Sequence, residues 1–324
     1  MNPFAWLRAL PWGLIIRQLA MFLVAMWVIV TATFFMARAI PGGPFTQERF
    51  IPPAIREQME RRYNLHLPVH QQYFSFLGHL LTLDLGPSFF EEGRTVNQVI
   101  ARDFPRSALL GTCALLFALA LGIPVGVIAA MHHHRWPDHS ALALVIAGVS
   151  VPSFIIASLL QYVFAYRLAG LLPASGLDAG IRSLIMPTLA LSAFALAFII
   201  RLVRASMIEV LQQDYITAAR ARGIRATVIA RHHALRNALL PVLTYLGPLT
   251  ASLFTGSFVI ETIFDIPGLG RQFVFSIENR DYGLILGVTV FYSALLLGIN
   301  MTIDLAYRWV DPRIAADETS GADS

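Results

Sequence analysis

The sequence contains no lysine, and all 24 of its basic residues are arginine. A nucleotide-binding P-loop uses a lysine to reach the β- and γ-phosphates of its ligand, so this chain has no residue for that task. Any ATP hydrolysis that drives its function must therefore take place on a partner protein. The single cysteine, Cys113, also excludes an internal disulfide and a metal site built from several thiolates.

Charge is scarce as well. Only 14% of the residues are charged and 56% are hydrophobic, which gives a mean hydropathy of +0.63. A soluble domain carries about 25% charged residues, so this composition is typical of an integral membrane protein. The net charge of +4 does not indicate nucleic-acid binding, because much of the arginine lies at the edges of apolar segments.

Six uncharged segments are long enough to cross, or nearly cross, a bilayer, which takes about 20 residues in a helix. β-barrel strands are short alternating segments instead. The first apolar segment ends near Ala37-Arg38-Ala39, a small-x-small pattern, but it is long for a signal peptide and favours a retained helix. We predict an all-α integral membrane protein. Its six transmembrane helices are expected at residues 19–35, 108–131, 141–166, 184–200, 238–260 and 284–303.

The distribution of arginine predicts the orientation of these helices. Twelve arginines lie on the side that holds both termini and residues 201–237, and four lie in the short loops on the other side. The other eight lie in or beside the long first loop, and long loops are translocated largely regardless of their charge. By the positive-inside rule, we expect both termini and residues 201–237 in the cytoplasm and residues 45–100 outside.

The most informative polar segment, residues 214–241, reads D-Y-I-T-A-A-R-A-R-G-I-R-A-T-V-I-A-R-H-H-A-L-R-N-A-L-L-P. Ala219 and Gly223 are four residues apart, which would place them on one face of a helix where a partner surface can approach closely. Arginines surround this pair. Taken alone, the arginines favour an ordinary positive-inside loop at lipid headgroups.

The spacing of this segment resembles the E-A-A-x3-G-x9-I-x-L-P loop of ABC-importer permeases. The matching positions are Ala218, Ala219, Gly223 and Leu235. The departures are Thr217 for Glu, His233 for Ile and Arg236 for Pro. These departures fit the peptide-importer branch, whose version of the loop is similar to A-R-A-K-G followed by R-H-A-L-R-N-A-L-x-P.

Further blocks extend the resemblance over nearly the whole chain. They include A-I-P-G-G-P-F-T-Q-E-R-F from Ala39, L-D-L-G-P-S-F from Leu83, V-S-V-P-S-F from Val149 and V-I-E-T-I-F-D-I-P-G-L-G from Val259. Their order resembles that in the B-type membrane subunits of oligopeptide permeases. The first two blocks are closer to oligopeptide permeases than to dipeptide or nickel permeases.

The resemblance implies the type I ABC importer permease fold and a permease subunit of an ATP-driven oligopeptide importer. It also implies a second homologous permease subunit, two ATP-binding subunits and an external peptide-binding protein. No cofactor is expected on this chain, since ATP and Mg would bind the partner subunits. The alternatives are a permease for dipeptides, nickel or another small solute, or a polytopic membrane channel or hydrolase. The sequence has no H-E-x-x-H or G-x-S-x-G motif to support a hydrolase.

The resemblance also implies a division of the chain. Residues 1–36 would form the N-terminal cytoplasmic end and first transmembrane helix, and residues 37–107 an external loop with helical segments. Residues 97–306 would form the core permease domain, including the coupling loop 201–237, and residues 307–324 a cytoplasmic tail. A helix at residues 217–235 would dock in a groove of an ATPase. The residues expected to couple to the ATPase are Thr217, Ala218, Ala219, Arg220, Arg222, Gly223, His233, Leu235 and Arg236.

Polar residues within or at the ends of the spans are candidates for the pathway or its gate. Gln161 and Asn300 either contact the substrate or form hydrogen bonds between helices. Glu261 opens an apolar turn with Pro and Gly, which we expect to fold back against the helices as a gate element. The tract from His132 to His134 suggests a metal site, but no patterned carboxylates accompany it, so a solvated or headgroup-facing loop is favoured.

Overall fold

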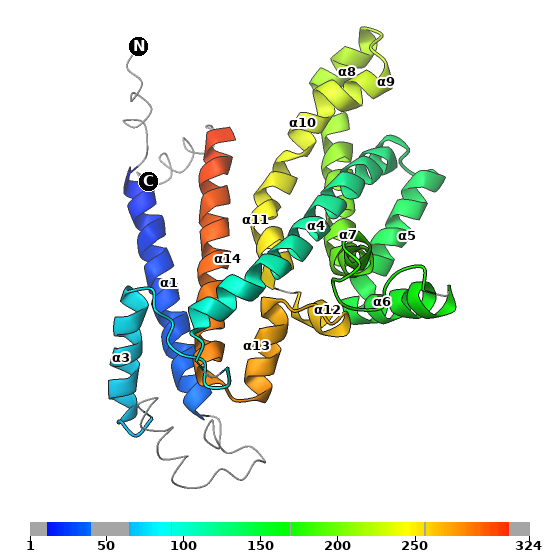
Figure 1. The fold of residues 1–324 in the computed structure, drawn as a ribbon. Helices are drawn as coiled ribbons and strands as arrows, with labels where there is room; N and C mark the ends of the chain where they lie inside the picture. Colours follow the sequence, from blue (N-terminus) through cyan, green and yellow to red (C-terminus); the bar gives the residue numbers. More distant parts are fainter. Residues whose placement is uncertain (1–11, 40–64, 92, 169, 256, 311–324) are drawn as a thin grey trace. The chain divides into compact units, whose positions relative to one another are not determined.

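The computed structural model describes residues 12–39, 65–91, 93–168, 170–255 and 257–310 (Figure 1). Residues 40–64, which begin the predicted external loop, and residues 311–324 of the predicted tail lie outside this description. The chain divides into two compact units, residues 1–100 with 275–301 and residues 101–274 with 302–324.

The first unit contains helix α1 (Trp12–Ala39), helix α3 (Val69–Leu81) and most of helix α14 (Tyr282–Val310). Aromatic rings hold α1 against α3. The ring of Phe34 lies 5.3 Å from that of Tyr73 and 6.1 Å from that of Phe76 between centroids. The hydroxyls of Thr31 and Tyr73 also share a hydrogen bond of 2.7 Å, so the contact is polar as well as apolar.

The second unit contains most of helix α4 and a run of shorter helices around one long helix, α7. Its helical elements are α4 (Val96–Met131), α5 (Trp136–Ser150), α6 (Ser153–Leu160), the π-helix η2 (Gln161–Arg167), α7 (Ile181–Leu211), α8 (Asp214–Ala221), α9 (Ala226–Val228), the π-helix η3 (Ile229–Ala234), α10 (Leu235–Ala238), α11 (Leu240–Thr255), α12 (Phe258–Ile263) and α13 (Leu269–Glu278). Helix α13 continues from this unit into the first.

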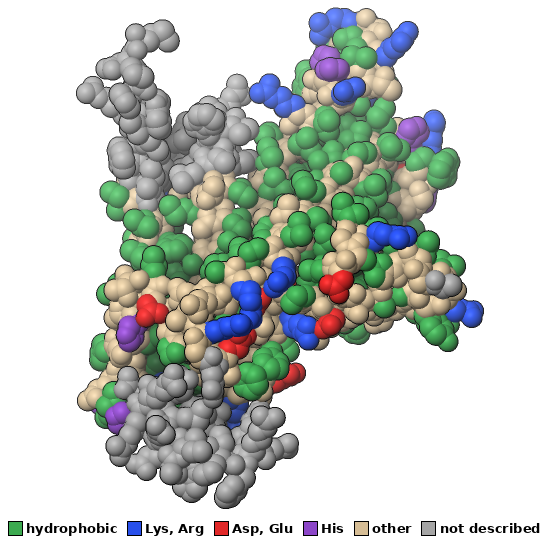
Figure 2. Space-filling model, in the orientation of Figure 1, with side chains coloured by type: hydrophobic (Ala, Val, Ile, Leu, Met, Phe, Trp, Pro, Cys, Tyr) green, Lys and Arg blue, Asp and Glu red, His purple; other side chains and the backbone are tan. Residues whose placement is uncertain are grey.

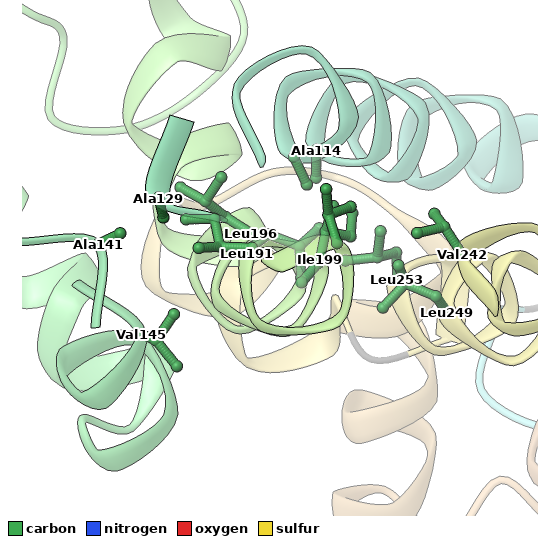
Figure 3. Close-up of a cluster of buried hydrophobic side chains, with 14 of the residues drawn as sticks. Ala114, Ala129, Ala141, Val145, Leu191, Leu196, Ile199, Val242, Leu249 and Leu253 are labelled. Carbon is green, nitrogen blue, oxygen red and sulfur yellow. The ribbon is translucent and has the colours of Figure 1, made fainter. Parts of the chain in front are cut away.

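Helix α7 is the centre of the apolar core of the second unit. Helices α5, α6 and α11 pack along it, and side chains of α4, α5 and α11 surround those of α7 (Figure 3). Small residues permit this close packing. A Cβ atom added to Gly148 of α5 would lie 2.8 Å from the carbonyl oxygen of Ala193 in α7, so glycine is required at this crossing.

The described residues contain five helices that are long and apolar enough to cross a membrane, and the pair formed by α5 and α6–η2 supplies a sixth crossing if it is counted as one span. This agrees with the predicted all-α membrane fold. The prediction of one continuous helix over residues 141–166 is wrong, because the pair is bent by 103°. Val151 is extended, and Pro152 is the N-cap residue of α6, which begins at Ser153. The proline ring disfavours helical geometry at the residue before it, so α5 ends there.

Candidate functional site

The arginine-rich segment forms a helical cap beyond the end of α7, built from α8, α9, η3 and α10 (Figure 1). Several of its apolar side chains point inward. Ile216, Ala219, Ile229 and Ala234 are each at most 1% exposed and belong to the core of the second unit. The segment is therefore a packed element of the protein with one solvent-facing side.

Helix α8 ends at Ala221, and Gly223 causes this end. Gly223 has a φ of +76°, the left-handed conformation that glycine adopts without a steric penalty. Its N–H donates to the carbonyl of Arg220 at 2.9 Å, and the N–H of Ile224 donates to the carbonyl of Ala219 at 3.3 Å. These two bonds form a Schellman motif, a common helix ending.

The expectation of one helix over residues 217–235 is therefore wrong, and so is the placement of Ala219 and Gly223 on one helical face. Ala219 is 1% exposed and packs inward. Gly223 lies after the helix and is exposed, with open space where a side chain would project. The sequence contained a signal for this arrangement, since an arginine followed by glycine at the end of an apolar periodic pattern is typical of a helix C-terminus.

The exposed side of α8 includes three small side chains beside Asp214, Tyr215 and Arg220. Thr217, Ala218 and Ala221 are exposed and lie three and four residues apart, on one face of the helix. This face differs from the one expected from the sequence, because neither Ala219 nor Gly223 belongs to it. Of the other predicted coupling residues, Arg220, Arg222 and Arg236 are exposed, and His233 and Leu235 are half-buried.

Arginine side chains surround this face and make the end of the unit strongly basic (Figure 2). The side chain of Arg220 donates to the carbonyl of Leu211 at 3.2 Å, and Arg222 donates to the carbonyl of Ala218 at 3.4 Å. Carbonyls at the ends of α7 and α8 are thereby satisfied. Within the described part of the chain, no carboxylate forms an ion pair with an arginine of residues 214–238.

A buried ion pair lies between α5 and α7. Asp138 is 2% exposed and accepts hydrogen bonds from Arg204 Nε at 2.5 Å and Arg204 Nη2 at 2.9 Å. The backbone N–H of His134 and the ring of His133 contact the same carboxylate at 3.0 and 3.1 Å. Sequence reasoning missed this cluster, although Asp138 follows the histidines by only four residues.

These contacts give His133 and His134 a structural role in the turn before α5. Asp138 is surrounded by donors and Arg204 neutralises its charge. No group of three or more His, Cys, Asp and Glu side chains suited to a metal ion occurs among the residues that the structure describes. The histidines belong to a turn that joins α4 to α5, and His133 helps to hold that turn on Asp138.

Two of the three candidate pathway residues make structural hydrogen bonds. Gln161 donates to the carbonyls of Ala174 and Ile263 at 2.8 and 3.1 Å. Glu261 is fully buried, and it accepts hydrogen bonds from Ser257 Oγ at 2.5 Å and from the N–H of Arg271 at 2.9 Å. These two hydrogen bonds hold the turn after α12 against that helix.

Asn300, the third candidate, belongs to the other unit. Its Oδ1 atom is buried and has no hydrogen-bond partner within the described residues. This buried amide oxygen is an acceptor that a partner or substrate could satisfy.

Comparisons with protein families, with individual proteins and with solved structures agree with one another. Residues 122–316 match the family described as "Binding-protein-dependent transport system inner membrane component". The chain is 46% identical over 287 residues to the dipeptide transport system permease protein DppB of Bacillus subtilis, which covers 89% of this chain and 92% of the relative. It is 43% identical over 302 residues to the oligopeptide transport system permease protein OppB of Salmonella typhimurium, covering 93% and 98% of the two chains.

Solved structures show the same fold at lower sequence similarity. A chain of the MetNI methionine ABC transporter in an inward-facing conformation aligns with a TM-score of 0.54 at 20% identity. The alignment covers 66% of the present chain and 96% of the MetNI chain. These values support the fold of type I importer permeases.

Proposed function

The chain belongs to the family of binding-protein-dependent transport system inner membrane components, and from this premise we propose that it forms half of the pathway of an ATP-driven oligopeptide importer. The observation that carries the proposal is 43% identity to an oligopeptide permease subunit over 93% of the chain. Relatives of this kind are permease subunits of ABC transporters without an ATPase site of their own. The chain is accordingly a transport subunit and not an enzyme.

Dipeptide transport is the second candidate, and a specific observation favours it. The identity to a dipeptide permease subunit is 46%, close to the 43% found for the oligopeptide relative. Both relatives act on peptides, so the class of substrate is common to the two candidates. The length of the peptide distinguishes them.

We propose four kinds of partner for the working importer: a second homologous permease subunit, two ATP-binding subunits that carry ATP and Mg, an external peptide-binding protein, and the peptide itself. The importer would lie in the bacterial inner membrane with both termini of this chain in the cytoplasm. The lack of lysine supports the assignment of ATP to partners. The arginine distribution supports the orientation.

We further propose that the cap made by α8, α9, η3 and α10 couples this chain to an ATPase subunit. The support is physical: α8 is anchored by buried Ile216 and Ala219, and it presents a face of small residues ringed by arginine. Small side chains let a groove close tightly around the helix, and unpaired basic groups favour an acidic rim on the partner. The packed base would transmit movement of the cap to α7.

Uptake by a deletion strain tests the proposed substrate. Deletion of the gene is expected to abolish uptake of tripeptides to pentapeptides and to give resistance to toxic analogues of that length. Restoration by the wild-type gene is the control. Loss of dipeptide uptake alone would favour the second candidate. Normal peptide uptake with loss of nickel or sugar uptake would refute both.

A further inference from the structure

We propose that a cavity in the first unit binds the phosphate group of an anionic membrane phospholipid. The cavity has a volume of about 210 Å³, and its walls come from the end of α1, from α3, from residues 85–89 and from the start of α14. All of these parts belong to the unit formed by residues 1–100 and 275–301. The proposal concerns a site separate from the cap and does not depend on which peptide is transported.

Arg38 supplies the positive charge of the cavity, and neutral neighbours hold it in place. Gln72 donates through Nε2 to the carbonyls of Leu67 at 2.7 Å and Leu65 at 3.2 Å. These bonds leave the amide oxygen of Gln72 to accept a hydrogen bond from Arg38 Nη2. The guanidinium carbon also lies 4.2 Å from the centroid of the Phe34 ring, a cation–π contact.

The charge of Arg38 has no anionic partner among the described residues. Its Nη1 atom is buried without a hydrogen-bond acceptor, and no carboxylate forms an ion pair with it there. A half-buried cation without a counter-charge is unfavourable, and an anion in the cavity would relieve this cost. The wall contains a second basic side chain, His79, and no carboxylate. Its chemistry therefore selects an oxyanion, and a guanidinium fork fits a phosphate well.

The wall formed by residues 87–89 and the start of α14 is held in place by Asp281. Its carboxylate accepts hydrogen bonds from Ser88 Oγ at 2.5 Å and from the N–H groups of Phe89 and Leu284 at 3.0 Å each. Gly283 permits the close approach of this loop, since a Cβ atom there would lie 2.3 Å from the carbonyl oxygen of Pro87. The cavity is therefore built by the fold and does not require a ligand to form.

The surroundings of the cavity favour a lipid as the source of the phosphate. Arg38 lies in the last turn of α1. Only 11% of the residues in the most apolar stretch of this helix are buried. Large hydrophobic side chains on α1 are exposed: Ile16, Leu19, Met21, Leu23, Val24, Trp27, Val28, Phe35 and Met36. An acyl chain can lie along this surface while its headgroup reaches the helix end, where lipid headgroups are found.

Native mass spectrometry of the complete importer with exchanged lipids tests the proposal. Equal amounts of phosphatidylglycerol and phosphatidylcholine are added to the purified complex, and the lipid retained on this chain is measured. We expect one phosphatidylglycerol to be retained preferentially. Arg38→Gln should weaken its retention about tenfold, the loss expected for one charge-assisted hydrogen bond. Ser75→Phe, which places a ring in the cavity and keeps Arg38, should weaken it as well.

Arg94→Gln is the matched control, because Arg94 belongs to the same unit, is exposed and pairs with Glu91 at 2.7 Å. Unchanged retention in Arg38→Gln would overturn the proposal, and equal losses in Arg38→Gln and Arg94→Gln would show diffuse attraction to the surface instead. Arg38-dependent binding of trialanine that displaces the lipid would assign the cavity to a peptide carboxylate. If Arg38→Gln fails to assemble, Arg38→Lys and Ser75→Phe decide the question with the same readout.

Discussion

Substitutions at two neighbouring alanines, Ala218 and Ala219, distinguish a docking role of α8 from a structural role. Ala218 is exposed, whereas Ala219 is 1% exposed in the core. Ala219→Leu should overpack the core, cost about 1–3 kcal/mol and lower the amount of protein in the membrane. Ala218→Leu should leave that amount unchanged, since leucine is almost as good a helix former as alanine. If α8 docks in a groove, Ala218→Leu should still abolish peptide uptake and co-purification of the ATPase. Normal uptake in this variant would remove the docking proposal.

Gly223 is required for its backbone conformation. At a φ of +76°, any other residue is strained, by roughly 1–2 kcal/mol for ordinary side chains and less for asparagine. Gly223→Val should therefore lower the thermal stability of the purified importer and its uptake, while Gly223→Asn should retain most of both. The measurements are the unfolding temperature in detergent and peptide uptake. Equal effects of the two substitutions would point to side-chain bulk and contradict the backbone explanation.

At this scale, the sequence predicted the composition of the cap better than its geometry. Its spacing identified Thr217, Ala218 and Gly223, all of which are exposed. It also assigned Ala219 to the exposed face, because a four-residue spacing was interpreted as one continuous helix. The left-handed turn at Gly223 breaks that periodicity, and the inward direction of Ala219 depends on packing with η3, which is adjacent in space and later in the sequence.

At the scale of elements, the pair of Asp138 and Arg204 joins the start of α5 to α7. Removing one member of a fully buried ion pair costs about 3–5 kcal/mol, whereas replacing both with apolar residues is often neutral. Arg204 is 18% exposed, so a smaller loss is expected here, and Asp138→Leu or Arg204→Met alone should reduce the unfolding temperature. The double variant should recover much of the loss. Additive losses in the double variant would mean that the two side chains act independently, against the bonds at 2.5 and 2.9 Å.

The bend in the third span shows why proline alone does not determine helix breaks. Pro124 and Pro187 lie inside the continuous helices α4 and α7, but Pro152 separates α5 from α6. All three occur in apolar sequence, so composition does not distinguish them. At Pro152 the local effect of the ring coincides with tertiary contacts, because α5 and α6 both pack against α7. Such contacts cannot be read from local sequence patterns.

For the whole molecule, composition was sufficient to predict the fold class. Long uncharged segments require helices in a bilayer, since unpaired backbone groups are too costly there. Five spans follow this rule directly. Long-range contacts could not be predicted from composition. The bonds of Asp281 to residues 88–90 join parts of the chain almost 200 residues apart, and no sequence motif indicated them.

The orientation of the whole chain gives a final prediction, made with Cys113 first replaced by serine so that no native thiol remains. Cysteines are then introduced at Gln71 of α3 and at Gln213 before α8, both of which are exposed. An impermeant thiol reagent added outside spheroplasts should label Gln71→Cys at once and Gln213→Cys only after the membrane is permeabilised. We expect this because twelve arginines lie on the side of Gln213, against four in the short loops opposite, and the positive-inside rule favours the cytoplasm for the arginine-rich side. Labelling of both positions from outside would refute the orientation, and with it the access of a cytoplasmic ATPase to the cap.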